Sequence, residues 1–296
     1  DVYKRQVVGP AASSSSEALG SSAPVAIFDS GLGGLSVLRA VRAALPDERL
    51  IYVADSRYAP YGERDDDFIA DRTLAIGEWL VSQGAKTLVV ACNTATAQSI
   101  AQTRERLAIP VIGVEPGIKP AALTSQTRVV GVLATAVTLR SARFQALAER
   151  HTSDCQFMLQ PGHGLVQAVE RCDTNSPELV ALLRSYVQPM LDANADTLVL
   201  GCTHYPFLDQ AIRSISGDRL TLIDTSIAIA RQLERQLDSF GLRAAPAQAR
   251  DQATELPRFY STNDGQALRQ LAASLLGLDV TVEHVVIPSR RTLALE

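Results

Sequence analysis

The chain contains two closely similar segments. Residues 87–97 read TLVVACNTATA and residues 197–207 read TLVLGCTHYPF, so each apolar run ends in a cysteine, first Cys92 and then Cys202. A short apolar run of this kind is typical of a buried parallel strand, and ligands of open α/β sheets bind outside the carboxyl ends of the strands. The duplication therefore predicts two copies of one unit that face each other across a shared site, with one thiol on each side.

Apolar strand-like runs alternate with helical patterns along the chain. The predicted strands cover residues 25–28, 50–54, 87–90, 111–114, 128–133, 155–159, 197–200 and 220–223. Between them apolar residues recur with the helical period, as at Leu179, Leu183, Val187 and Met190. This order predicts an α/β fold with two pseudo-symmetric lobes. Each lobe should contain a mainly parallel sheet flanked by helices, with the active site in the cleft between the lobes.

The expected division of the chain has three parts. Residues 1–23 are rich in Ser, Ala and Gly and show no period, so we expect a disordered leader, and its first residues resemble a cloning scar rather than native sequence. Residues 24–114 plus 225–296 should form a discontinuous N-terminal lobe, because the tail has to return to it. Residues 115–224 should form the C-terminal lobe.

Composition excludes several classes of function. A formal net charge of -4 and an aromatic content of 5% provide no basic stripe or stacking platform, so nucleic-acid binding is not expected. No apolar run approaches the roughly 20 residues of a membrane helix, and a secretory signal is lacking, so we expect no membrane partner and a cytoplasmic location. The four cysteines show no CxxC pairing and are interpreted as free thiols, with Cys155 and Cys172 as structural residues.

The segment DSGLGGLSVL, residues 29–38, follows the first predicted strand and opens a helix. Its glycines permit a tight turn, and the N-terminus of a helix presents unpaired N–H groups on which a carboxylate or phosphate could dock. The alternative is that the glycines only allow close packing of strand and helix. No GxGxxG or Walker pattern is present, so a nucleotide site is not supported. Asp29, at the end of a core strand, is either a functional carboxylate or a helix cap.

The motifs FDSGLGGLSV, YVADSRYAPYG, VACNTA, GVEPGIKPA and LGCTHYP together span about residues 25–277. In this order they resemble the cofactor-independent glutamate racemases, enzymes that make D-glutamate for bacterial cell walls. The resemblance implies two lobes clasping glutamate, with Cys92 and Cys202 as acid/base thiols that act on the D and the L enantiomer respectively. It also implies assistance from Asp29 and His204, with Glu170 near His204. The substrate-binding residues implied by the motifs are Ser30, Tyr61, Gly62, Asn93, Thr94 and Thr203.

One segment departs from the pattern of these racemases. Residues 160–170 read QPGHGLVQAVE, where many relatives carry a CPLFVPLVE-like stretch before the glutamate. Glu170 is therefore the implied site residue with the least support from the motifs. His163, which lies beside glycines in this segment, is interpreted as a loop residue.

The two thiols suit the inversion of an α-carbon. The reaction needs a base on one face and an acid on the other, and a free thiol with a pKa of about 8.5 can take either role near neutral pH. No cofactor is expected, because of the three lysines, Lys4, Lys86 and Lys119, only the last could form a Schiff base, and nothing near it resembles a phosphate cup. No metal is expected either, since the four histidines are scattered.

Two other functions remain as alternatives. A racemase of aspartate or a related acid would share the paired cysteines, but such relatives usually carry Glu where this chain has His204. A non-catalytic amino-acid-binding protein would need neither thiol. Glutamate is the favoured small-molecule partner. The sequence leaves the oligomeric state open, with a homodimer as one option.

Overall fold

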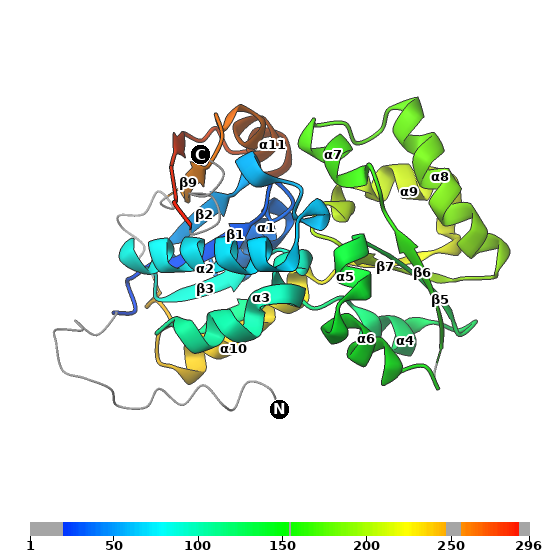
Figure 1. Cartoon of the computed structure of the whole chain (residues 1–296), viewed down its shortest axis with the longest axis horizontal. Coiled ribbons are helices and arrows are strands. Elements are labelled where there is room, and N and C mark those ends of the chain that lie inside the picture. Colours follow the sequence, from blue (N-terminus) through cyan, green and yellow to red (C-terminus); the bar gives the residue numbers. More distant parts are fainter. Residues whose placement is uncertain (1–19, 154, 247–255, 290–296) are drawn as a thin grey trace.

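The computed structural model describes residues 20–153, 155–246 and 256–289 and contains two α/β lobes side by side (Figure 1). Most of the predicted leader, residues 1–19, lies outside the described residues. Within the described part, no helix is long and apolar enough to cross a membrane.

The N-terminal lobe contains a six-stranded sheet in the order β10-β9-β2-β1-β3-β4, and every pairing is parallel. Its strands are β1 (Val25–Asp29), β2 (Leu50–Ala54), β3 (Thr87–Val90), β4 (Val111–Gly113), β9 (Arg258–Ser261) and β10 (Val282–His284). Alternate residues of the central strands face opposite sides, so both faces of the sheet are apolar and need a covering layer. One face is covered by α1 (Leu35–Ala44), α10 (Ser226–Ser239) and α11 (Gln266–Leu276), and the other by α2 (Asp66–Ser82) and α3 (Asn93–Arg106).

The C-terminal lobe contains a four-stranded parallel sheet in the order β6-β5-β7-β8. Its strands are β5 (Val129–Ala134), β6 (Gln156–Pro161), β7 (Thr197–Gly201) and β8 (Thr221–Ile223). One face packs against α7 (Leu165–Glu170), α8 (Pro177–Asp192) and α9 (Asp209–Ser216), and the other against α4 (Ile118–Thr124), α5 (Ala136–Arg140) and α6 (Ala142–Glu149). Short 3-10 turns complete the connections: η2 (Ser56–Tyr58), η3 (Tyr61–Glu63), η4 (Tyr205–Leu208) and η5 (Gly217–Arg219).

The two sheets share one strand order. In β2-β1-β3-β4 and in β6-β5-β7-β8, the second strand of the lobe is followed by the first, the third and the fourth. The strands of the repeated sequence, β3 and β7, therefore occupy the same place, which confirms the predicted fold class of two related α/β lobes. In an open sheet of this order, a crevice forms at the carboxyl ends of the first and third strands, where the connections leave toward opposite faces.

The chain returns to the N-terminal lobe after β8. Helix α10 packs against α1, and β9 pairs with β2, so the tail extends the first sheet. Residues 20–23, within the predicted leader, form a turn in which Ala23 N donates to Gly20 O. The exact residue limits of the lobes stay a prediction.

Candidate active site

The glycine-rich turn after β1 is closed by its own aspartate. Gly34 N donates to Asp29 Oδ2 at 2.7 Å, and a Cβ on Gly34 would lie 2.7 Å from Asp29 Cβ, so the turn has no room for a side chain there. Asp29 is fully buried, and among the described residues no group donates to its second oxygen, Oδ1. Burial raises the pKa of Asp29, while the charge of His204 and the Gly34 N–H oppose this shift. Asp29 thus caps the turn and keeps one carboxylate oxygen free.

The same turn receives a carboxylate from the other lobe. Leu32 N donates to Glu170 Oε1 at 2.7 Å, and Glu170 lies at the end of α7. A Cβ on Gly31 would overlap Glu170, and a Cβ on Gly33 would overlap His204. The glycines therefore allow the C-terminal lobe to approach the backbone of the turn. The anion that docks on this turn is a protein side chain.

Glu170 also links the glycine turn to the second thiol, Cys202, through His204. Glu170 Oε1 lies 2.6 Å from His204 Nε2, and His204 Nδ1 lies 3.7 Å from Cys202 Sγ. Burial lowers the pKa of His204, but its interactions with Cys202 and Glu170 outweigh burial and raise the pKa well above the ordinary value of 6.5. His204 is thus protonated at neutral pH, and its positive charge stabilises negative charge on the Cys202 sulfur.

The first thiol has different partners. Cys92 is the N-cap of α3, with Sγ 3.4 Å from Ala95 N and 3.3 Å from Ser30 Oγ. Burial raises the pKa of Cys92 above its ordinary value, and the charge of Asp29 adds to the shift. The hydrogen bonds from Ser30 and Ala95 oppose it but do not outweigh burial. Cys92 is therefore a protonated thiol at neutral pH.

Three threonine hydroxyls join the lobes beside Cys92. Thr94 Oγ1 lies 2.9 Å from Thr135 Oγ1, which in turn lies 2.9 Å from Thr138 Oγ1. Thr94 is a predicted substrate-binding residue, whereas the sequence analysis did not single out Thr135 and Thr138. The signal for Thr135 was present in the sequence, because it follows the first strand of its lobe as Ser30 follows the first strand of the other.

The remaining predicted binding residues lie at the same interface, except for the side chain of Tyr61. Asn93 is buried, and its Oδ1 accepts no hydrogen bond from the described residues. The backbone oxygen of Thr203 accepts from Ser36 Oγ at 3.3 Å. A Cβ on Gly62 would lie 3.1 Å from Thr135 Cβ. The Tyr61 side chain, in contrast, is 1% exposed, and its hydroxyl donates to Asp55 inside the N-terminal lobe.

Residues that the sequence analysis set aside lie elsewhere. Cys155 is buried in the core of the C-terminal lobe, with Sγ 3.6 Å from Ala122 O. His163 is exposed in a turn, as expected of a loop residue, and its carbonyl accepts from Tyr186 OH. Lys119 is exposed on α4. The described ranges contain no group of three or more His, Cys, Asp or Glu side chains arranged to hold a metal ion.

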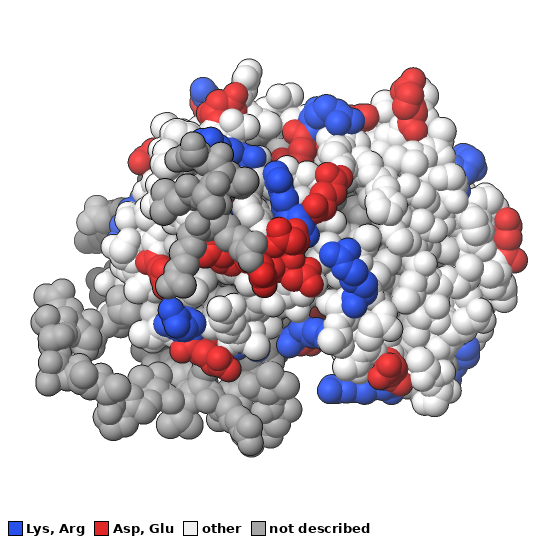
Figure 2. All heavy atoms as spheres, viewed as in Figure 1, with Lys and Arg blue, Asp and Glu red and all other residues white. Residues whose placement is uncertain are grey.

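The cleft between the thiols is closed. Cys92 and Cys202 are only 5% and 7% exposed. Polar contacts join the two lobes, including an ion pair of 3.6 Å between Asp66 and Arg140 and a hydrogen bond from Gln167 to Glu63. Figure 2 shows acidic and basic side chains mixed over the middle of this face, where the lobes meet.

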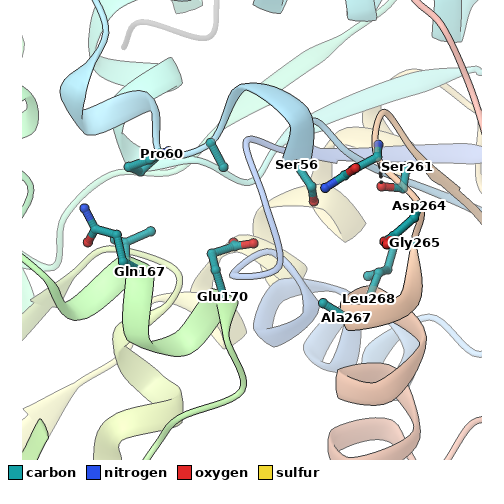
Figure 3. Close-up of a pocket in the computed structure, with 12 residues that line it drawn as sticks. Ser56, Pro60, Gln167, Glu170, Ser261, Asp264, Gly265, Ala267 and Leu268 are labelled. Carbon is teal, nitrogen blue, oxygen red and sulfur yellow. Dashed lines mark hydrogen bonds between the residues drawn. The ribbon is translucent and has the colours of Figure 1, made fainter.

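A cavity of about 270 Å³ opens beside Glu170 (Figure 3). Gln167 and Glu170 line it from α7, and Asp264 and Leu268 line it from the opposite lobe. Pro60 also contributes to its wall. The carboxylate that bonds His204 is therefore accessible from a space between the lobes.

The chain is similar to known proteins over most of its length. The sequence pattern of the Asp/Glu/Hydantoin racemase family matches residues 35–233. The chain belongs to this family. A glutamate racemase of Ralstonia pickettii (strain 12J) is 62% identical over 255 residues, which cover 86% of this chain and 88% of the relative. The resemblance found in the motifs is thereby confirmed.

Two solved structures of family members are similar to this fold. Escherichia coli glutamate racemase, in complex with L-glutamate and the activator UDP-MurNAc-ala, superposes with a TM-score of 0.78 at 32% identity, covering 90% of this chain and 100% of that one. Glutamate racemase from Francisella tularensis subsp. tularensis SCHU S4, in complex with D-glutamate, has a TM-score of 0.77 at 27% identity, covering 90% and 98%. Both enantiomers are thus ligands of proteins with this fold.

Proposed function

We propose that this chain interconverts L-glutamate and D-glutamate by moving the α-proton between Cys92 and Cys202, and so supplies D-glutamate for peptidoglycan synthesis in the cytoplasm. The observation that carries the proposal is the pair of thiols. They follow equivalent strands of two facing lobes, and each has its own hydrogen-bond partners. The name of the relative that is 62% identical supports glutamate as the substrate. A homodimer stays a prediction.

The proposed reaction begins with Cys202 as thiolate and Cys92 as thiol. Cys202, beside protonated His204, removes the α-proton of L-glutamate, and Cys92 donates a proton to the opposite face of the α-carbon. The product is D-glutamate, with the proton on Cys202 and the negative charge on Cys92. The reverse reaction, or proton exchange with solvent, restores the first state. The direction assigned to each thiol follows the family resemblance.

Removal of the α-proton needs help from hydrogen-bond donors. An amino acid's α-proton is far less acidic than a thiol, so charge that develops on the α-carboxylate must be stabilised in the transition state. We assign this role to Asn93, Thr94 and Thr203, which the motifs place in the site. Thr135 and Thr138 add two further hydroxyls to this group of donors, because both lie within hydrogen-bond reach of Thr94.

The rest of the substrate is assigned to the N-terminal lobe. By the same motifs, Ser30 and the Tyr61-Gly62 segment hold the substrate's other polar groups. Tyr61 does so through its backbone, because its hydroxyl already donates to Asp55. Both thiols are buried, so glutamate enters only when the lobes move apart. Asp29 acts indirectly, because it holds the glycine turn that follows β1. Glu170 also acts indirectly, because it bonds His204, which contacts Cys202.

The test is an incubation of the purified protein with L-glutamate or L-aspartate in deuterated water, followed by chiral separation and mass analysis. We expect D-glutamate that carries deuterium at the α-carbon, without added cofactor or metal, and unchanged aspartate. Conversion of aspartate alone would identify the sister racemase. Binding of glutamate without conversion would identify a non-catalytic binding protein.

A further inference from the structure

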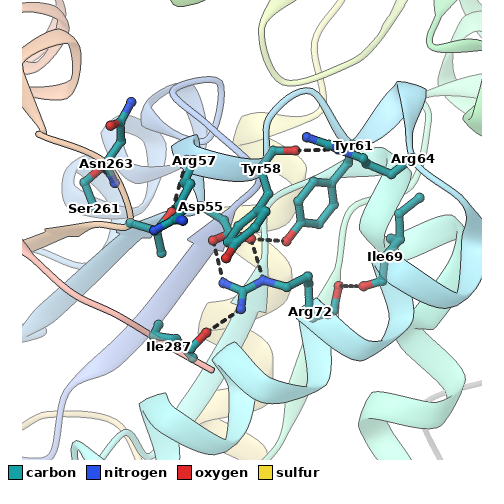
Figure 4. A network of polar contacts seen from close by, with 12 residues as sticks. Asp55, Arg57, Tyr58, Tyr61, Arg64, Ile69, Arg72, Ser261, Asn263 and Ile287 are labelled. Atoms are coloured by element: carbon teal, nitrogen blue, oxygen red, sulfur yellow. Dashed lines mark hydrogen bonds and ion pairs between the residues drawn. The ribbon is translucent and has the colours of Figure 1, made fainter. Parts of the chain in front are cut away.

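A fully buried ion pair lies under the segment that the motifs assign to the substrate. Asp55 directly follows β2, and Arg72 lies in α2. Arg72 Nη2 donates to Asp55 Oδ1 at 2.7 Å and Arg72 Nε donates to Asp55 Oδ2 at 3.0 Å, and neither side chain is exposed (Figure 4). This two-point geometry is specific to the planar fork of arginine.

The ion pair holds two tyrosines of the loop formed by residues 56–64. Tyr61 OH donates to Asp55 Oδ2 at 2.5 Å, and the Arg72 guanidinium lies 4.5 Å from the centre of the Tyr58 ring. Burial and the Asp55 charge raise the pKa of Tyr61, so its hydroxyl stays protonated and remains a donor. The loop is thus bound at both of its tyrosines to one guanidinium-carboxylate pair.

Arg72 also connects this loop to the end of the described chain. Its third nitrogen, Nη1, donates to the carbonyl oxygen of Ile287, which follows β10 (Figure 4). Asp55 N donates to Asp29 O at 3.0 Å, at the start of the glycine turn. Arg72 therefore joins α2, Asp55 at the end of β2 and the C-terminal segment, and the Asp55 backbone in turn bonds the end of β1 at Asp29.

A buried ion pair seldom adds net stability over apolar side chains of similar volume. The planar fork of Arg72, in contrast, gives Asp55 a defined two-point geometry. Here the fixed element is the loop that carries Gly62 to Thr135 of the other lobe. We propose that Arg72 is a positioning residue for the substrate: through Asp55 and Tyr61 it holds the Tyr61-Gly62 backbone in the conformation that receives glutamate. This inference rests on the proposed function.

The main test is Arg72→Lys, which keeps the charge but removes the fork. We expect KM to rise about tenfold for both L- and D-glutamate, because a misplaced loop weakens binding of either enantiomer. We expect kcat and the isotope effects with α-deuterated substrates to change less than about twofold, because neither thiol is touched. Tyr61→Phe, which removes one hydrogen bond and leaves the ion pair, should raise KM about threefold by the same route.

The chain offers a matched control for loss of stability. Lys86 and Glu48 form a second buried ion pair of 2.6 Å in the same lobe. Lys86 directly precedes β3 and Glu48 lies just before β2, so this pair is at the amino ends of the strands, opposite to the carboxyl ends where the site lies. Glu48→Gln should lower the unfolding temperature, as the other variants do, but leave KM unchanged at a temperature where all variants are folded.

The inference is overturned if KM of Arg72→Lys is no higher than that of Glu48→Gln, or if kcat falls while KM is unchanged. If Arg72→Lys does not fold, an unchanged KM in Tyr61→Phe overturns it equally. Wild-type protein that binds glutamate without racemising it would instead refute the proposed function, so the two failures are distinguishable.

Discussion

The two thiols lie at equivalent positions of equivalent lobes, yet their surroundings differ in charge. Both follow the third strand of their sheet and are almost equally buried. Cys92 has neutral donors, Ser30 Oγ and the N–H of Ala95, whereas Cys202 has a protonated imidazole that is itself bonded to Glu170. Equivalent backbone positions therefore do not imply equal chemistry.

The difference begins in the residues that follow each cysteine. After Cys92 the segment NTATA continues into α3, so the sulfur caps a helix of 14 residues. After Cys202 the chain forms the 3-10 turn η4, and His204 lies directly before that turn. His204 is free to meet Glu170 from α7, because it is outside a regular helix. The proposed mechanism needs one thiol with its proton and one without, and the His204 charge beside Cys202 is what distinguishes the two sites.

The largest expected effect comes from removing either thiol. Cys92→Ala and Cys202→Ala should each lower racemisation by about 10²–10⁴-fold or more, the range of general acid–base catalysis. Cys155→Ala and Cys172→Ala serve as controls and should retain most of the activity. The rate of D-glutamate formation, measured by chiral separation, decides between these outcomes.

The same variants sharpen the comparison between the lobes. In deuterated water, Cys92→Ala keeps Cys202 and should exchange the α-proton of L-glutamate without inverting it, while Cys202→Ala should do so with D-glutamate. The opposite pattern would reverse the roles of the thiols. Near-normal turnover of either variant would sink the two-thiol mechanism.

A smaller effect is expected from the residues that assist the thiols. His204→Asn should lower kcat by about 10- to 100-fold with little change in KM, because the lost charge matters chiefly when the proton moves. Its primary isotope effect should increase most with α-deuterated L-glutamate, and that of Asp29→Asn with D-glutamate. If both variants only raised KM, with rates and isotope effects unchanged, these residues would be binding groups.

The smallest effect concerns the reactivity of the resting protein. At pH 7, iodoacetamide should alkylate Cys202 about tenfold faster than Cys92, because protonated His204 supports a thiolate while burial raises the pKa of Cys92. Mass analysis of the two cysteine peptides measures the ratio. His204→Asn should reduce this ratio, and faster alkylation of Cys92 would contradict the assignment of the resting state.

The pH dependence of this difference has a definite sign. Folding raises the pKa of His204. The stabilisation that the His204 charge gives to the folded protein is therefore complete below pH 6.5, the ordinary pKa of histidine, and is lost as the pH rises through the raised pKa. The ratio of the alkylation rates should therefore be constant through neutral pH and decrease in the alkaline range. A ratio that falls between pH 5 and pH 7 would show that His204 titrates normally.

Much of this molecule could be predicted because its signals are local. The apolar runs at 25–28, 50–54 and 87–90 predicted strands within one residue of those observed, since buried parallel strands need continuous apolar sequence. The repeat around Cys92 and Cys202 predicted that both thiols lie at the carboxyl edge of a sheet. The glycines of residues 31–34 predicted a tight turn, but left open whether it accepts an anion or only allows close packing.

The sequence by itself thus determined the two α/β lobes and the types of residue at the site. Only the tertiary structure decided which groups meet. Glu170 lies 34 positions from His204 and 138 from Leu32, yet it bonds both. Likewise, the Tyr61 side chain proved to be bound to a buried ion pair. The Glu170 contacts depend on how the two lobes approach each other. The pKa values of Cys92 and His204 likewise depend on burial and on neighbouring charges that residues distant in sequence supply.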